Sequence, residues 1–548
     1  MTSTIPNPWR NANIDWRLVL MSLVLAALAL VLHLMSGGIF LSPENLYNLA
    51  QQTAVVGIVS TVMVLVIVAR HIDLSVGSVM GFVGVLIAYL QYTAGWSWPA
   101  ACLAGLAVAL AVSVYQGWLT AVLGVPSFVV TLGGLMSFRG AAFLVADGKT
   151  QPVSDDFFLR LGGGYDGGIG VAPTWVLAAL ALVFHLMSGG IFLSPENLYN
   201  LAQQTAVVGI VSTVMVLVIV ARHIDLSVGS VMGFVGVLIA YLQYTAGWSW
   251  PAACLAGLAV ALAVSVYQGW LTAVLGVPSF VVTLGGLMSF RGAAFLVADG
   301  KTQPVSDDFF LRLGGGYDGG IGVAPTWGLA ALVVLGLCAR MALARRAKRG
   351  HGVEPEPLWL DALVTAVPCA LMLAFAWAMN HYQISSKPEP QGIPIPVLIW
   401  AVVAGVLSFI VHRTRFGRYV FAMGGNPDAA ALVGIPVKRV TLMLFALLAV
   451  LITIAAIVSV ARLNAGTNSL GTSMELYVIA AAVIGGTALS GGSGSIFGSV
   501  LGALIMQSLD SGMLLLDVPI GKRMVIIGQV LIVAVVFDVL YRKWFGEN

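Results

Sequence analysis

The feature that most constrains this chain is a series of long apolar runs. Residues 440–460, for example, contain no Asp, Glu, Lys or Arg, and about 20 such residues are enough for a helix to cross a bilayer. Charged residues make up only 9% of the 548 and hydrophobic residues 59%, whereas a soluble domain is about 25% charged. We therefore expect an all-α polytopic membrane protein embedded in a lipid bilayer. The net charge of +3 is too small for a nucleic-acid-binding protein.

A near-identical internal repeat is the second constraint. Residues 24–175 (copy 1) recur at 176–327 (copy 2), and the sole mismatch is Leu32 against Phe184. Ancient repeats diverge wherever their environments differ, so this one indicates a recent tandem duplication or an error in assembling the sequence.

The repeat divides the chain into three segments. An N-terminal segment covers residues 1–175 and includes copy 1, copy 2 covers 176–327, and a C-terminal segment covers 328–548. Removing one copy of 152 residues from 548 leaves 396. We take that shorter length as the functional unit and copy 2 as the anomalous insertion. The possibility that the 548-residue form is inactive stays open.

The apolar runs predict about ten membrane-spanning helices in the 396-residue unit. These runs lie at 17–35, 51–69, 72–92, 98–123, 126–146, 328–344, 360–379, 394–411, 440–460, 476–489, 494–515 and 523–541. The basic residues of 340–349 and of loop 412–439 are expected on the cytoplasmic side, together with the N-terminus, because cytoplasmic loops are rich in Lys and Arg. Copy 2 adds four clear runs, at 203–221, 224–244, 250–275 and 278–298, and a hybrid run at 176–191. If the hybrid run crosses the membrane, the orientation of everything after it inverts.

The most informative loop is 412–439, which reads HRTRFGRYVFAMGGNPDAAALVGIPVKR between two apolar runs. Asn426 is a favourable N-cap, Pro427 suits the first helical position, and Asp428 complements the positive end of the helix dipole. Gly434, which a proline follows two residues later, provides the stop. These residues predict a short capped helix between two basic arms. An ordinary interfacial helix and a rigid knob that docks on a cytoplasmic partner both fit the pattern.

Residues 416–437, FGRYVFAMGGNPDAAALVGIPV, resemble the coupling-loop signature of the ABC importer permeases for ribose, xylose and arabinose. Two further motifs agree. HIDLSVGS at 71–78 and 223–230 is similar to that family's E-[IL]-D-L-S-V-G-S, with His71 in place of the usual Glu. GGTALSGGSGSIFGSVLGALI at 485–505 is similar to its glycine-rich C-terminal motif. The resemblance covers essentially the whole 396-residue unit and looks closest to D-xylose permeases.

The resemblance implies the partners of a transport assembly. A cytoplasmic ATPase subunit is expected to dock on residues 424–435, a periplasmic sugar-binding protein to deliver a pentose, and a second permease copy to complete a homodimer in the bacterial inner membrane. The loop residues that match the family's coupling loop are Gly417, Arg418, Gly424, Gly425, Asn426, Pro427, Asp428 and Gly434.

The resemblance also implies that the HIDLSVGS motif lies near the translocation path. Its residues are Asp73, Ser75, Gly77 and Ser78, with the copies Asp225, Ser227, Gly229 and Ser230. The residue types alone favour a plainer interpretation at least as well, because Asp and Ser cap helices and small residues let helices approach closely.

A stripe of small residues at every fourth position predicts a helix face that is used for packing. The stripe consists of Ser490, Gly494, Gly498 and Gly502.

A phosphate-binding loop is missing from the sequence. Gly148, Lys149 and Thr150 resemble the end of one, but position 143 is Phe where the motif requires Gly. We therefore expect a translocation subunit that is not an enzyme and has no cofactor or metal, with ATP hydrolysed on a separate subunit.

The function predicted from these observations is import of a monosaccharide, most simply D-xylose or another pentose. A secondary sugar transporter or facilitator is the first alternative, although its internal repeats would be diverged halves. A signalling or assembly protein of the membrane is the second, and the match to the coupling loop speaks against it.

Overall fold

The computed structural model describes residues 71–146, 183–315, 319–350, 358–383, 389–489 and 491–530, with positions 63, 66, 181 and 532 besides. Its regular structure there is helical except for one two-stranded sheet, which confirms the all-α prediction. Nine of the described helices are long and apolar enough to cross a membrane. The run predicted at 17–35 lies outside the described residues, as does that at 51–69 except for positions 63 and 66.

Copy 1 supplies a unit of three helices that pack on one another. They are α3 (Val76–Tyr92), α4 (Trp98–Ala121) and α5 (Ser127–Ala146). Gly95 and Gly124 adopt positive φ between successive helices, a conformation that glycine reaches without strain. Ile72 N donates to Ser127 Oγ at 3.1 Å, so the segment before α3 is tied to the start of α5.

Copy 2 repeats this unit, and a central helix before it also lies within its described residues. Its helices are α7 (Pro195–Val220), α8 (Val228–Tyr244), α9 (Trp250–Ala273) and α10 (Ser279–Ala298). Ile224 N donates to Ser279 Oγ at 3.2 Å, which reproduces the copy 1 contact. Nearly every residue of α7 from Leu201 onward is buried. Because lipid tails are as apolar as Leu, close packing against neighbouring helices holds α7 in place.

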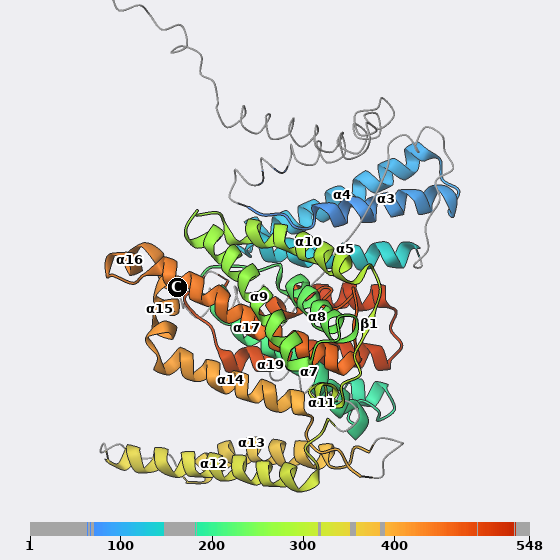
Figure 1. Cartoon of the computed structure of the whole chain (residues 1–548). Coiled ribbons are helices and arrows are strands. Elements are labelled where there is room, and N and C mark those ends of the chain that lie inside the picture. Colours follow the sequence, from blue (N-terminus) through green and yellow to red (C-terminus); the bar gives the residue numbers. More distant parts are fainter. Residues whose placement is uncertain are drawn as a thin grey trace, which may run out of the picture.

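The C-terminal segment completes the bundle around α7. Its long helices are α12 (Val323–Gly350, which begins in copy 2), α13 (Leu358–Met379), α14 (Ile395–Arg413), α17 (Val437–Leu463) and α19 (Ile496–Leu515). The shorter elements of the chain are β1 (Gln303–Pro304), α11 (Asp308–Arg312), α15 (Arg415–Gly425), α16 (Pro427–Leu432), β2 (Ala465–Gly466) and α18 (Met474–Ile484). The helices α14, α17, α18 and α19 all pack on α7, whereas α12 and α13 form an outer pair along one edge, of which α13 also contacts α7 (Figure 1).

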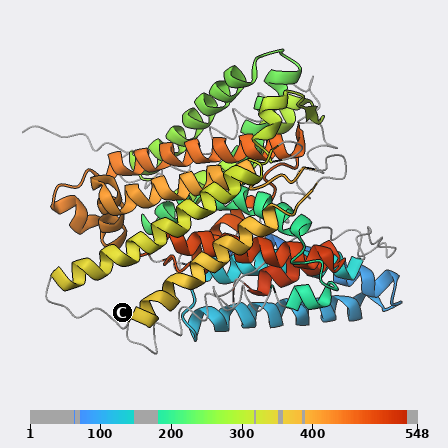
Figure 2. The same cartoon turned by 90° about the horizontal axis from the view of Figure 1, so that it is seen from below.

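The two copies occupy different sides of this bundle. The helix α9 packs along α17, and α8 contacts both α17 and α18. The helices α3 to α5 lie instead beside the C-terminal helices drawn in red in Figure 2. Copy 2, which the sequence analysis took as the insertion, is thus the copy that forms the central bundle with the C-terminal segment.

The residue that distinguishes the two copies is buried in that bundle. The ring centroid of Phe184 lies 5.6 Å from that of Phe192, and the Phe184 ring fills the space that a Cβ at Gly512 of α19 would need. Residues 183–187 are helical and end in a turn at 188–190. Most of the preceding part of the hybrid run lies outside the described residues.

Candidate functional site

The predicted coupling loop folds into two short helices, α15 and α16, at one end of the bundle (Figure 1). The first begins after Thr414, whose Oγ1 accepts a hydrogen bond from Gly417 N at 3.3 Å. Gly417 is buried where a Cβ would meet the carbonyl oxygens of Ile410 and Val411, so the chain turns back tightly on the end of α14. Arg418 is exposed. The sequence predicts only a basic arm in this stretch, and α15 was not expected.

The second helix of the loop, α16, has the caps that the sequence predicts. Asn426 Oδ1 accepts from Ala429 N at 3.0 Å, and Pro427 and Asp428 occupy the first turn. Gly434 has a φ of 85° directly after the helix. A side-chain cap together with a glycine stop fixes both ends of a helix that is too short to be stable alone.

Arg222 fastens these two helices to the end of α7. Its Nε donates to Gly424 O at 2.6 Å, and its Nη2 donates to Gly425 O at 2.6 Å. Both carbonyls lie at the C-terminal end of α15, where unpaired carbonyls and the helix dipole favour a cation. Gly424 also lies so close to Val220 O that a side chain would not fit. Two hydrogen bonds and a close backbone contact therefore join the end of α15 to the end of α7.

Two residues of the glycine-rich motif also contact the end of α7 and Arg222. Gly492 N donates to Val220 O at 2.9 Å, and Gly491 lies against the Arg222 side chain. Both glycines have positive φ, 85° at Gly491 and 77° at Gly492, which other residues adopt only with strain. The coupling loop and the glycine-rich motif thus meet at the carboxyl end of α7, directly before HIDLSVGS. Arg222 was not predicted from the sequence; the signal that could have pointed to it is its position at the end of an apolar run, directly before HIDLSVGS.

The stripe of small residues divides between a loop and a helix. The helix α19 begins at Ile496 because Ser495 caps it, accepting from Gly498 N at 3.0 Å. Gly494 therefore precedes the helix, and it packs against the side chains of Val216 and Val220. Gly498 and Gly502 lie against the backbone of α18. Gly494 therefore does not share a helix face with Gly498 and Gly502, and Ser490 lies outside the described residues.

The HIDLSVGS motif begins a helix in both copies. Asp225 Oδ1 accepts from the N and from the Oγ of Ser227, each at 2.7 Å, and Gln268 Nε2 of α9 donates to Ser227 Oγ at 3.0 Å. The copy 1 residues that repeat these contacts are Asp73, Ser75 and Gln116. The carboxylate two residues upstream, rather than the serine side chain, thus caps the N-terminus of each helix.

The two copies of this motif differ in what surrounds them. Gly229 lies against Gly471 O and the carboxylate of Glu475 at the start of α18, where a Cβ would collide. Ser230 is buried beside it, as is Ser78 in copy 1, whereas Gly77 is half-buried. In copy 2 the motif is therefore part of the contact between α8 and α18.

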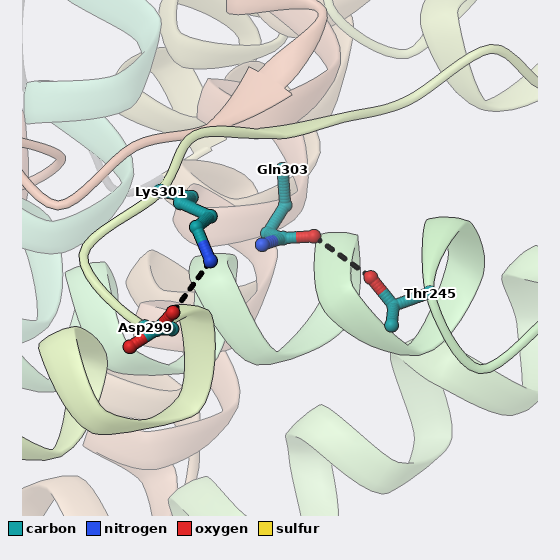
Figure 3. A network of polar contacts seen from close by, with 4 residues as sticks. All are labelled: Thr245, Asp299, Lys301 and Gln303. Carbon is teal, nitrogen blue, oxygen red and sulfur yellow. Dashed lines mark hydrogen bonds and ion pairs between the residues drawn. The ribbon is translucent and has the colours of Figure 1, made fainter.

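The opposite end of copy 2 is also tied to the C-terminal segment, through β1, and Figure 3 shows polar contacts within copy 2 beside that strand. The helix α10 ends at Asp299, and Lys301 pairs with the Asp299 carboxylate and thereby lowers its pKa. Thr245 Oγ1 donates to Gln303 Oε1 at 2.9 Å. Gln303 belongs to β1, which pairs antiparallel with β2 directly after α17.

The chemistry of the site is that of a mechanical junction. Its contacts are helix caps, a guanidinium on backbone carbonyls and close glycine packing, and none of these provides a nucleophile or an acid–base pair. Within the described ranges, no group of three or more His, Cys, Asp or Glu side chains is placed to hold a metal ion.

A comparison with protein families gives a match over most of the chain. The family described as the permease component of branched-chain amino acid transport systems matches residues 45–187 and 197–535. The second of these matches runs without a break from α7 to the C-terminal helical residues. The first covers most of copy 1 and ends in the hybrid run.

Individual relatives match about two thirds of the chain. The xylose transport system permease protein XylH of Haemophilus influenzae is 39% identical over 368 residues, which are 67% of this chain and 95% of the relative. XylH of Escherichia coli K12 is 35% identical over 66% of this chain and 89% of the relative. The ribose import permease protein RbsC of the same strain is 30% identical over 66% of this chain and 91% of the relative. No solved structure matches the chain.

Proposed function

Because the chain belongs to the family of transport-system permease components, we propose that it is the permease subunit of an ATP-driven importer for a pentose. D-xylose is the first candidate, since two of the relatives are named as xylose permeases and ribose is the substrate in the name of a more distant one. The permease provides the path through the membrane and does not hydrolyse ATP itself.

The observation that carries this proposal is the capped knob formed by α15 and α16. Leu432 and Val433 at its tip are 88% and 78% exposed, while Ala430 is buried and holds the helix to the bundle. Exposed apolar side chains on a rigid support are typical of a docking surface. We propose that a cytoplasmic ATPase subunit binds residues 424–435, with Lys438 and Arg439 at the rim of the contact.

Coupling follows from the way in which the knob is attached. Arg222 and the Gly424–Val220 contact join α15 to α7, and α7 packs most extensively on α14, α17, α18 and α19 of the C-terminal segment. Binding and hydrolysis of ATP on the partner would displace the knob, and α7 would move with it relative to α14, α17, α18 and α19. Such a rigid displacement of packed helices is a common way of switching a path between two sides of a membrane.

The orientation is part of the proposal. The knob end faces the cytoplasm, as does the N-terminus, so the β1–β2 end faces the periplasm of a bacterial inner membrane. A periplasmic sugar-binding protein delivers the pentose there, and two permease chains pair as a homodimer. We further propose that copy 2 and residues 328–548 form the functional unit, which makes copy 1 the added block.

The experiment is uptake of labelled xylose into cells that carry the matching ATPase subunit and variants of the knob. Asn426→Leu removes the cap of α16, and Gly425→Arg places a second cation beside Arg222, so both are expected to abolish uptake while the chain still inserts in the membrane. Asn426→Asp keeps a capping oxygen and is the matched control, with uptake close to that of the wild type.

Uptake of xylose in cells without the ATPase subunit would contradict the proposal and favour a facilitator. Labelled ribose and arabinose in the same assay identify the preferred pentose.

A further inference from the structure

The helix α10 presents an uncovered face, although the same sequence is covered in copy 1. Leu284 and Met288 are 42% and 71% exposed, whereas the equivalent Leu132 and Met136 of α5 are 2% and 4% exposed. At Gly292 of α10, no atom lies within 4 Å of the position that a Cβ would take. The amino-acid sequence of the two helices is identical, so the difference lies in what covers them.

Residues 520–530, which are helical, contact α5 closely. Gln529 Nε2 donates to Ser137 Oγ at 2.8 Å. A Cβ at Gly140 would meet Gly521 O and would lie 2.8 Å from Val525 N, so the two helix backbones almost touch. Small residues that let backbones approach in this way are the usual basis of helix association in membranes.

We propose that the face of α10 around Ser289 and Gly292 is the docking site for residues 520–530 of a second copy of this chain. Ser289 and Gly292 are the copy 2 equivalents of Ser137 and Gly140, and both are exposed. Two helices of identical sequence present identical surfaces, so the segment that fits α5 also fits α10. This inference rests on the proposed pairing of two permease chains and identifies the surface that they share.

Copy 1 then acts as a substitute for the second chain. The helix α5 binds residues 520–530 of its own chain. A contact within one chain is favoured over the same contact between chains because its effective concentration is higher. In the 548-residue chain, α10 is therefore left uncovered because its partner segment is already bound. Displacement of α5 is expected to release that segment for the α10 of another chain.

Paired cysteines in the full-length chain test the inference. In a background in which Cys102, Cys254, Cys338 and Cys369 are replaced by Ala, one tagged chain carries Ser289→Cys and a differently tagged chain carries Gln529→Cys. A disulfide between them then reports only the contact between chains. Ser137→Cys with Gln529→Cys in one chain reports the contact within the chain.

The matched glycines decide between the two contacts. Gly140→Trp in the Gln529→Cys chain is expected to displace α5 and to raise the yield of the disulfide between chains about tenfold, the effect of severe overpacking on an equilibrium. Gly292→Trp in the Ser289→Cys chain is expected to abolish that disulfide again. The disulfide within one chain, between positions 137 and 529, is expected to be lost in Gly140→Trp and to be unchanged in Gly292→Trp.

A chain without residues 24–175 provides a second way to remove α5 if Gly140→Trp does not fold, and the same disulfide between chains is expected there. Native mass spectrometry distinguishes the pairing of two chains from the use of the α10 surface for that pairing. Dimers that form without the disulfide between positions 289 and 529 would overturn the α10 surface and leave the pairing intact. Monomers throughout would overturn both.

Discussion

Copy 1 and copy 2 have the same sequence but different neighbours, and their glycines separate the contacts made inside each unit from those made outside it. A Cβ at Gly105 would lie 2.6 Å from Ile87, and a Cβ at Gly257 would lie 2.6 Å from Ile239. These equal distances between α4 and α3, and between α9 and α8, show that the three-helix unit folds in the same way in both copies.

The outward-facing glycines behave differently. A Cβ at Gly236 would lie 3.0 Å from Val460 of α17, whereas nothing lies within 4 Å of the equivalent position at Gly84. The relation is reversed at Gly140, which is crowded by residues 521–525, and Gly292, which is open. The unit is thus determined by its own sequence, while the place of each copy is determined by the C-terminal segment, of which the chain has one.

The largest effect is expected at the attachment of the knob, which copy 2 alone supplies in the described structure. Arg222→Ala removes both hydrogen bonds to the end of α15, and bonds to a charged group are worth about 1.5–3 kcal/mol. Xylose uptake is expected to fall roughly tenfold or more. Arg70→Ala, the same change in copy 1, is the control and should leave uptake unchanged because the carbonyls of Gly424 and Gly425 already bind Arg222. Equal losses in the two variants would contradict the assignment of copy 2 to the functional unit.

The next effect is one of stability. Gly236→Leu inserts a side chain between α8 and Leu470 and Val460, and overpacking of this kind costs about 1–3 kcal/mol. Gly84→Leu adds the same side chain where α3 has open space, so its thermal unfolding midpoint in detergent should stay close to that of the wild type. A larger drop for Gly84→Leu than for Gly236→Leu would show that the two copies are interchanged.

A smaller effect is expected to be equal in the two copies. Gln268→Leu and Gln116→Leu each remove the hydrogen bond to the serine that precedes α8 or α3, at a cost of about 1 kcal/mol. Amide hydrogen exchange in the first turns of α8 and α3 should accelerate by similar factors. Strongly unequal factors would mean that the local unit depends on its neighbours after all.

The smallest effect is expected for Lys301→Ala. The side chains of Lys301 and Asp299 are 73% and 85% exposed, and exposed ion pairs contribute little. Neither the unfolding midpoint nor uptake should change measurably. Gln303→Ala is the informative neighbour, because it removes the bond to Thr245 that joins β1 to α8, and it should lower the midpoint more than Lys301→Ala does.

The sequence was sufficient for features that depend on nearby residues. The runs predicted at 250–275 and 278–298 are observed as α9 and α10, because length and apolarity alone decide a membrane helix. The capped helix after Asn426 was predicted because a cap, a proline and a glycine stop lie within the nine consecutive residues 426–434.

The sequence was insufficient wherever a contact joins distant segments. It could not show which copy packs on α17, since identical sequences have identical patterns. It also did not reveal that Arg222 binds the end of α15, because the acceptors are the backbone carbonyls of Gly424 and Gly425, which have no sequence signature. The stripe from Ser490 to Gly502 was assigned to one helix because spacing alone does not show that Ser495 starts α19.

The most direct test of the central claim is a pair of cysteine cross-links from the two copies to the same residue of α17. A Cβ at Gly269 would lie 3.0 Å from the Cβ of Phe445, whereas nothing lies within 4 Å of the position of a Cβ at Gly117. Disulfides form when Cβ atoms are about 3.5–4.5 Å apart, so a small relaxation suffices for Gly269. In the chain without native cysteines, Gly269→Cys with Phe445→Cys should form an intramolecular disulfide, and Gly117→Cys with Phe445→Cys should not. A disulfide from position 117 in equal or higher yield would show that copy 1, and not copy 2, completes the transport unit.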